Sequence, residues 1–151
     1  YINNIIVGTL IIMTFKYITF ANECYFELKL SYENMYSFYN TLVTRIESTP
    51  GFDENTKVAL VGNYNGSLLT NNKLRFSDLE DFTGILKNYE LITAYSKENF
   101  IRNYIGADFI YASAEEINYL VNNKEVQKMS NYPYDNSIKK IDNIIVIKFS
   151  D

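Results

Sequence analysis

The chain has 151 residues, of which 47% are hydrophobic, and its net charge is −4 at neutral pH. This length allows one domain with its own core and an appended segment. Because no block of basic residues occurs, binding to nucleic acid is excluded. The absence of histidine and the single cysteine, Cys24, exclude serine–histidine and cysteine–histidine catalysis, a disulfide framework and histidine- or cysteine-based zinc sites. We therefore expect no metal and no cofactor.

The N-terminal part of the chain is strongly apolar. Residues 5–21 read IIVGTLIIMTFKYITFA, with Lys16 as the only charge. Extended over residues 2–21, this run approaches the ~20 residues that cross a bilayer, and it lacks the polar stripe of an amphipathic surface helix. A pair of buried strands is an alternative. A signal peptide is another, although the basic segment and the cleavage site that define one are missing. Residues 1–24 are predicted to form the last membrane helix or its remnant.

The residues after this run indicate an orientation. Glu23, Glu27 and Glu33 follow it with only Lys29 to balance them, so the positive cluster typical of a cytoplasmic flank is missing. We expect residues 25–151 to form an extracytoplasmic domain of a bacterial membrane protein. Because the chain starts with tyrosine, we also expect it to be a piece of a longer protein.

Residues 25–47 carry the clearest helical periodicity. Apolar and aromatic residues recur at the i, i+3, i+4 and i+7 spacing that one helix face requires. These residues are Tyr25, Leu28, Tyr32, Met35, Tyr36, Tyr39, Leu42, Val43 and Ile46. Polar residues, including Glu27, occupy the opposite face. The pattern predicts an amphipathic helix that packs on a core and ends before Pro50 and Gly51.

The middle of the chain alternates between strand and helix signals. Residues 57–62 read KVALVG, which is typical of a strand buried on both faces in a parallel sheet. Capping patterns predict helices over about 77–87, over 97–105 with Gly106 as its end, and from Ser113 onward. Further short elements are expected at 91–95, 108–111 and 124–129, the first two extended and the last helical.

The tail is predicted to form a hairpin. Its strands are residues 137–141 and 144–149, joined by a type I′ turn at Asp142 and Asn143. The second strand is apolar on both faces and should lie centrally. The fold class is α/β: a small mixed sheet, with a central strand at about 57–62 and a hairpin at about 137–149, flanked by helices and preceded by a long N-terminal helical segment.

The order of these elements resembles a known family. The apolar helix leads into Asn22-Glu23-Cys24-Tyr25, then come Val58–Gly62 and the tail Met129-Ser-Asn-Tyr-Pro-Tyr-Asp-Asn-Ser-Ile138. This order is similar to the C-terminal region of the bacterial Gtr-type (type II) membrane glucosyltransferases. The glycine expected before Ser137 is replaced by Asn136, which also tolerates a left-handed turn.

The resemblance implies a polytopic membrane glucosyltransferase that acts on cell-surface glycans with a lipid-linked sugar donor. Its catalytic carboxylates are expected in loops between earlier membrane helices, so no catalytic residue is carried over to this chain. The chain would be a non-catalytic domain that binds acceptor glycan or caps the active site, with the upstream membrane domain of the same protein as its partner.

Two loops combine the aromatic, amide and carboxylate groups that suit carbohydrate. The candidate glycan-binding residues are Asn63, Tyr64, Asn65, Tyr132, Tyr134 and Asp135. An alternative is that the loop at 63–65 is an ordinary connection and that residues 132–134 only anchor a turn to the core. A free-standing two-carboxylate hydrolase would need an acidic cluster at 78–81 or 115–116, where helix capping already explains acidic residues. A structural or protein-interaction module is the third reading.

Overall fold

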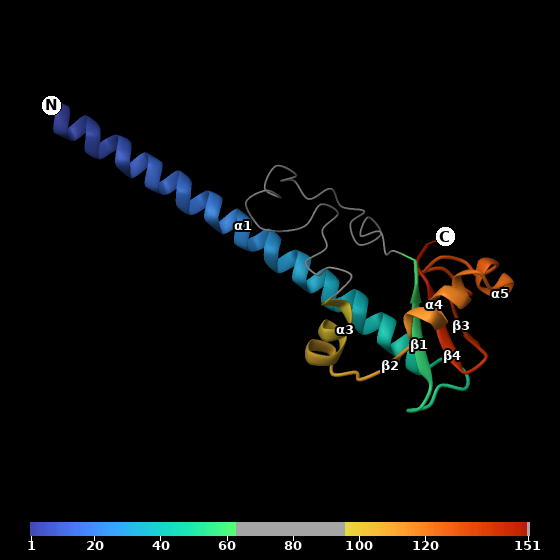
Figure 1. The fold of residues 1–151 in the computed structure, drawn as a ribbon. Coiled ribbons are helices and arrows are strands. Elements are labelled where there is room, and N and C mark those ends of the chain that lie inside the picture. Colours follow the sequence, from blue (N-terminus) through green and yellow to red (C-terminus); the bar gives the residue numbers. More distant parts are fainter. Residues whose placement is uncertain (63–95, 151) are drawn as a thin grey trace.

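A computed structural model describes residues 1–62 and 96–150 (Figure 1). A single long helix leads from the N-terminus to a small α/β unit that holds the C-terminal half of the described residues. The predicted loop at 63–65, the predicted helix at 77–87 and the predicted extended segment at 91–95 lie outside the described residues.

Helix α1 covers Ile2–Glu47, a continuous length of 46 residues. It passes without interruption through position 24, where the predicted membrane segment meets the predicted domain. The helical form excludes the pair of buried strands considered for residues 2–21. The helix ends at Ser48, and Gly51 follows with a φ of 84°, a left-handed conformation that glycine adopts without strain.

The sheet contains four strands in the order β2–β1–β4–β3. Its strands are β1 (Lys57–Val61), β2 (Ile110–Tyr111), β3 (Ile138–Ile141) and β4 (Ile144–Lys148). Strand β1 runs parallel to β2 and β4, and β3 pairs antiparallel with β4. The predicted mixed sheet is confirmed, with the 57–61 strand and the second hairpin strand at its centre. Both are apolar on both faces because both faces of the sheet are covered.

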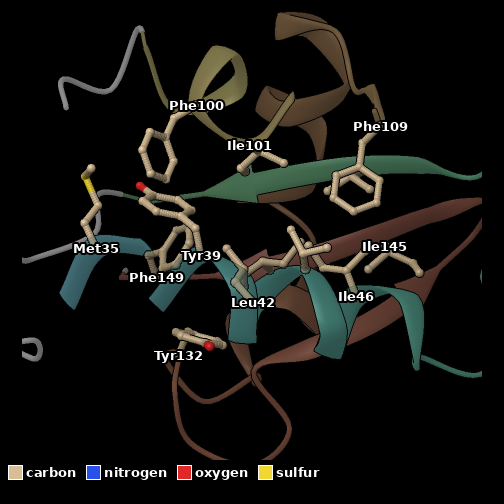
Figure 2. Close-up of a cluster of buried hydrophobic side chains, with 13 residues drawn as sticks. Met35, Tyr39, Leu42, Ile46, Phe100, Ile101, Phe109, Tyr132, Ile145 and Phe149 are labelled. Atoms are coloured by element: carbon tan, nitrogen blue, oxygen red, sulfur yellow. The ribbon is translucent and has the colours of Figure 1, made fainter. Parts of the chain in front are cut away.

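One face of the sheet packs against the C-terminal half of α1 (Figure 2). Leu42 and Ile46 are fully buried there against Val58 of β1 and Ile145 of β4. Phe100 and Ile101, which follow the undescribed segment, complete this layer. The last part of α1 therefore packs on the sheet as part of the hydrophobic core.

The buried stripe on α1 differs from the predicted one at its N-terminal end. Tyr25 is 75% exposed, whereas Glu27, predicted on the solvent face, is 2% exposed. Glu27 and Ser31 extend the stripe of Met35 at the i, i+4 spacing of one helix face. Periodicity predicted the right helix, but the buried positions Glu27 and Ser31 each lie one residue before the predicted positions 28 and 32.

The opposite face of the sheet is covered by α4 (Ala114–Val121) and α5 (Lys124–Gln127). Leu120 and Val126 pack there on Ala59 of β1 and Val146 of β4. Leu120 occupies the inward position, whereas Val121 is 47% exposed. The unit is thus a three-layer arrangement of helix, sheet and helix.

The segment before β2 begins as helix α3 (Lys97–Phe100) and continues as η4 (Ile101–Ile105). The prediction of one α-helix over 97–105 is right in extent, but its second half has π-helical hydrogen bonding, which periodicity does not reveal. Gly106 ends it with a φ of 85°, as predicted.

The hairpin turn differs from the expected type I′ turn. Asp142 has a φ of 54°, whereas Asn143 is not among the residues with positive φ. A type I′ turn needs positive φ at both central residues, so this prediction is wrong. The strand positions are nevertheless as predicted within a residue. Asn136 has a φ of 65°, so the position at which the family resemblance leads us to expect glycine is left-handed here.

Candidate functional site

A cavity lies beside the edge of β1. Strand β2 pairs only with Lys57 and Val58, and Ala112 adds one hydrogen bond, from its N–H to the oxygen of Val58 at 2.9 Å. Beyond that point, no described strand covers this edge. The cavity there has a volume of about 210 Å³. Its walls come from β1, β2, α3, α4 and the residues that directly follow β1, β2 and β4: Val58, Leu60, Gly62, Lys97, Glu98, Tyr111, Ala112, Ile117 and Phe149.

Tyr111 is one of the residues that line this cavity. The hydroxyl oxygen is buried and has no hydrogen-bond partner. Burial raises the pKa of Tyr111 to about 12, with a further increase from the nearby carboxylates of Glu98 and Asp108 that Arg102 partly offsets. The group therefore stays protonated at physiological pH and can donate a hydrogen bond.

Lys97 contributes the charge of the cavity wall. It is 8% exposed, and its side chain makes no hydrogen bond or ion pair with residues 1–62 or 96–150. Its neighbour Glu98 is exposed to solvent.

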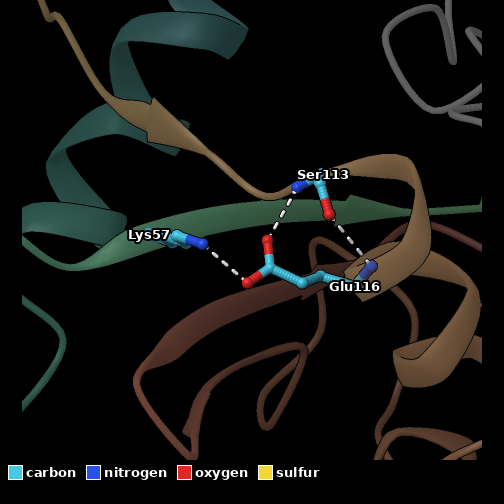
Figure 3. A network of polar contacts seen from close by, with 3 residues as sticks. All are labelled: Lys57, Ser113 and Glu116. Carbon is cyan, nitrogen blue, oxygen red and sulfur yellow. Dashed lines mark hydrogen bonds and ion pairs between the residues drawn. The ribbon is translucent and has the colours of Figure 1, made fainter.

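The N-terminus of α4 is held by a polar network (Figure 3). The Ser113 hydroxyl accepts from the Glu116 N–H at 3.2 Å, and Glu116 accepts from the Ser113 N–H at 2.8 Å, which confirms the predicted capping box. Lys57 also donates to Glu116 at 2.6 Å. The hydrogen bond from Lys57 and then that from the Ser113 N–H lower the pKa of Glu116 below its usual value. A carboxylate held in this way is a structural group and a poor proton donor, which argues against the hydrolase reading at this position.

The structure separates the predicted glycan-binding residues. Tyr132 is 2% exposed, and its ring packs on Phe38 and Phe149 while the Arg45 guanidinium lies 5.0 Å from its centroid. Burial raises the pKa of the Tyr132 hydroxyl. The ring belongs to the core and has no free face for a sugar, as the turn-anchor alternative proposed.

The other predicted residues have different positions. Tyr134 is 66% exposed and Asp135 is also exposed. Both therefore remain available to a ligand, whereas Asn63, Tyr64 and Asn65 lie outside the described residues. Sequence reasoning missed Lys97 and Tyr111. The predicted extended segment at 108–111 was the available signal, but its parallel pairing with β1 could not be read from its two-residue length.

The largest exposed apolar surface belongs to the first half of α1. Within the described residues, α1 alone is long and apolar enough to cross a membrane, and none of its apolar stretch is buried. The exposed residues point in every direction around the helix: Ile2, Ile5, Ile6, Val7, Leu10, Ile11, Ile12, Met13, Phe15, Tyr17 and Ile18.

The described residues contain no cluster of three or more cysteine, aspartate and glutamate side chains that could hold a metal ion. No protein-family model matches the chain, and neither a curated protein nor a solved structure is similar to it.

Proposed function

We propose that this chain is the membrane-anchored, non-catalytic C-terminal part of a bacterial membrane glucosyltransferase. In this proposal, α1 crosses the bilayer and the α/β unit lies outside the cytoplasm. The observation that carries the membrane assignment is the first half of α1, whose apolar side chains are exposed around its whole circumference. A helix that is apolar all round needs an apolar environment on every side, which a lipid bilayer supplies.

The polar side chains within this stretch support the assignment. The hydroxyls of Thr9, Thr14 and Thr19 donate to the carbonyls four residues earlier, at 2.9, 2.8 and 3.0 Å. Each hydroxyl is thus satisfied within the helix, as the interior of a bilayer requires. Lys16 lies five positions from Ala21 and can extend its ammonium toward the headgroups.

The residues that follow suit the edge of a membrane. Tyr25 and Phe26 are 75% and 56% exposed, and aromatic side chains are enriched at membrane interfaces. Glu23 and Glu33 outnumber Lys29 on this flank, which favours the extracytoplasmic side. The helix then continues into the core of the α/β unit.

The glucosyltransferase part of the proposal has a different basis. It rests on the order of the membrane helix, the 58–62 strand and the Tyr132–Ile138 tail, as set out from the sequence. The left-handed Asn136 and the exposed Tyr134 and Asp135 are compatible with it. Tyr134 and Asp135 remain the candidate contacts for an acceptor glycan, and NMR titration with oligosaccharides tests them. If no resonance of this loop shifts, the glycan part of the proposal fails.

Cysteine accessibility in intact bacterial cells tests the topology. In a Cys24→Ser background, a membrane-impermeant maleimide should label Lys139→Cys, because Lys139 is exposed on β3. The matched variant Leu10→Cys should stay unlabelled because lipid covers it. Labelling of Leu10→Cys in intact cells, or of Lys139→Cys only after lysis, would contradict the proposed arrangement.

A structural or protein-interaction module is the second candidate. Tyr32, Tyr36 and Tyr104 are each at least 40% exposed and lie in one aromatic group, with ring centroids 6.4 Å apart for both pairs that include Tyr32. Exposed aromatic residues are enriched in protein interfaces. Light scattering of the full chain in detergent distinguishes the two candidates: an oligomer that dissociates in Tyr104→Ser would favour the interaction module.

A further inference from the structure

Strand β3 leaves one edge of the sheet open. It is the last strand in the order β2–β1–β4–β3, and no described strand pairs with its outer side (Figure 1). The Lys148 N–H donates to the Ser137 oxygen at 3.0 Å, so the backbone of Ser137 faces β4. Backbone groups alternate in direction along an antiparallel strand, so those of Lys139 also face β4, whereas those of Ile138 and Lys140 face outward. An open edge of this kind is a template for a further strand.

The side chains of β3 give this edge a positive charge. Lys139 is exposed, and it forms no ion pair within the described part of the chain. Lys140 donates to the carbonyl oxygen of Gly51 at 2.6 Å, and it lies close enough to Asp53 for their charges to interact. Lys139 is therefore the charge that an added strand would meet.

These lysines disfavour pairing of β3 with a second copy of the chain. Only outward-facing residues form hydrogen bonds across the new edge, so Ile138 or Lys140 of one copy must lie opposite one of these residues in the other. The antiparallel registers with the greatest overlap place Lys139 opposite Lys139 or Lys140 opposite Lys140. Like charges directly opposite each other destabilise a sheet, whereas a carboxylate opposite Lys139 stabilises it.

We propose that the outer edge of β3 binds an extended, acidic segment of a partner protein as an additional strand of the sheet. Backbone hydrogen bonds to Ile138 and Lys140 supply affinity, and an acidic side chain opposite Lys139 supplies specificity. Ile141 is 5% exposed and packs in the core, so β3 is held in place before a partner binds. This inference does not depend on the glucosyltransferase proposal, because it uses only residues of the sheet.

NMR titration of the full chain in detergent micelles tests the inference. The probes are two capped hexapeptides, one that alternates valine with glutamate and one that alternates valine with lysine. We expect saturable binding of the glutamate peptide only. Hydrogen exchange of the Ile138 and Lys140 amides should then slow by at least about tenfold, because each amide gains a hydrogen bond. The amides of Lys139 and Ile141 already face β4 and should exchange slowly with and without peptide.

A charge reversal provides the second arm of the test. Lys139→Glu should weaken binding of the glutamate peptide about tenfold and make the lysine peptide the better ligand. The matched control Lys124→Glu makes the same change at an exposed position on α5 and should leave both affinities unchanged. The inference is overturned if neither peptide binds, if both bind equally, or if Lys139→Glu leaves the preference unchanged. Slow exchange of the Ile138 and Lys140 amides without peptide would also overturn it, because a second copy would then occupy the edge.

Discussion

Leu42 is the residue at which the attachment of α1 to the sheet is most directly tested. It is fully buried and packs with Ile46 and Val58 in the core. Leu42→Ala removes three carbon atoms, which at about 0.8 kcal/mol each correspond to about 2.4 kcal/mol of lost transfer free energy. The cavity left between helix and sheet adds to this, so the free energy of unfolding should fall by about 3–4 kcal/mol.

Urea unfolding of the full chain in detergent, followed by tyrosine near-ultraviolet circular dichroism, measures this loss. The chain has 14 tyrosines and no tryptophan, so tyrosine supplies the tertiary signal. The matched control Leu10→Ala removes the same atoms from a position that is 57% exposed in the apolar half of the helix. It should change the unfolding free energy of the α/β unit by less than about 0.5 kcal/mol. A loss below about 1 kcal/mol for Leu42→Ala, or equal losses for both variants, would refute the packing of α1 on the sheet.

Three further substitutions test other contacts. Glu116→Gln should reduce the loss of stability on acidification. The lowered pKa of Glu116 contributes stability that is complete above its ordinary value of 4.5 and is lost as the pH falls through the folded-state pKa. Melting temperatures of variant and wild type, measured between pH 7 and about pH 3, should therefore converge at the acidic end. Lys148→Met should lower the unfolding free energy by about 1–3 kcal/mol. Lys148 is 4% exposed and donates to the carbonyls of Gln127 and Met129 at 3.1 and 3.2 Å. The control Lys139→Met should leave the unfolding free energy unchanged in the same urea titration. Gly62→Ala should lower the free energy of unfolding by at least about 1 kcal/mol. Gly62 has a φ of 81°, and an added Cβ would lie 2.5 Å from the backbone oxygen of Ser150. An unchanged melting temperature would show that the backbone relaxes there.

Local patterns predicted most of the described elements. The strand at 57–61 and the hairpin strands were evident because short apolar runs bounded by turn residues are typical of buried strands. The capping box at Ser113 was evident because its two hydrogen bonds join residues three positions apart. Information of this kind is local, so the sequence alone carries it.

The features that sequence reasoning missed depend on contacts between distant segments. The cavity lined by Lys97 and Tyr111 lies beside a two-residue strand that pairs parallel to β1, and a two-residue strand has no period to detect. Glu27 is buried although its charge predicts exposure, since burial depends on which neighbours cover a helix face. The sequence made Tyr132 a candidate for stacking on a sugar. In the structure, Phe38, Phe149 and Arg45 pack against its ring and leave no face for a ligand.

The continuity of α1 links the two halves of the molecule physically. From Asn22 to Glu47 the helix contains neither glycine nor proline, the residues that usually permit a kink. Its apolar half is exposed on all sides, and its other half carries the core residues Leu42 and Ile46.

The distance along the axis from Ala21 to Met35, where the apolar core begins, is about 21 Å at a rise of 1.5 Å per residue. If residues 2–21 lie in a bilayer, the α/β unit is therefore held at a fixed height above the membrane surface and cannot pivot freely on a linker.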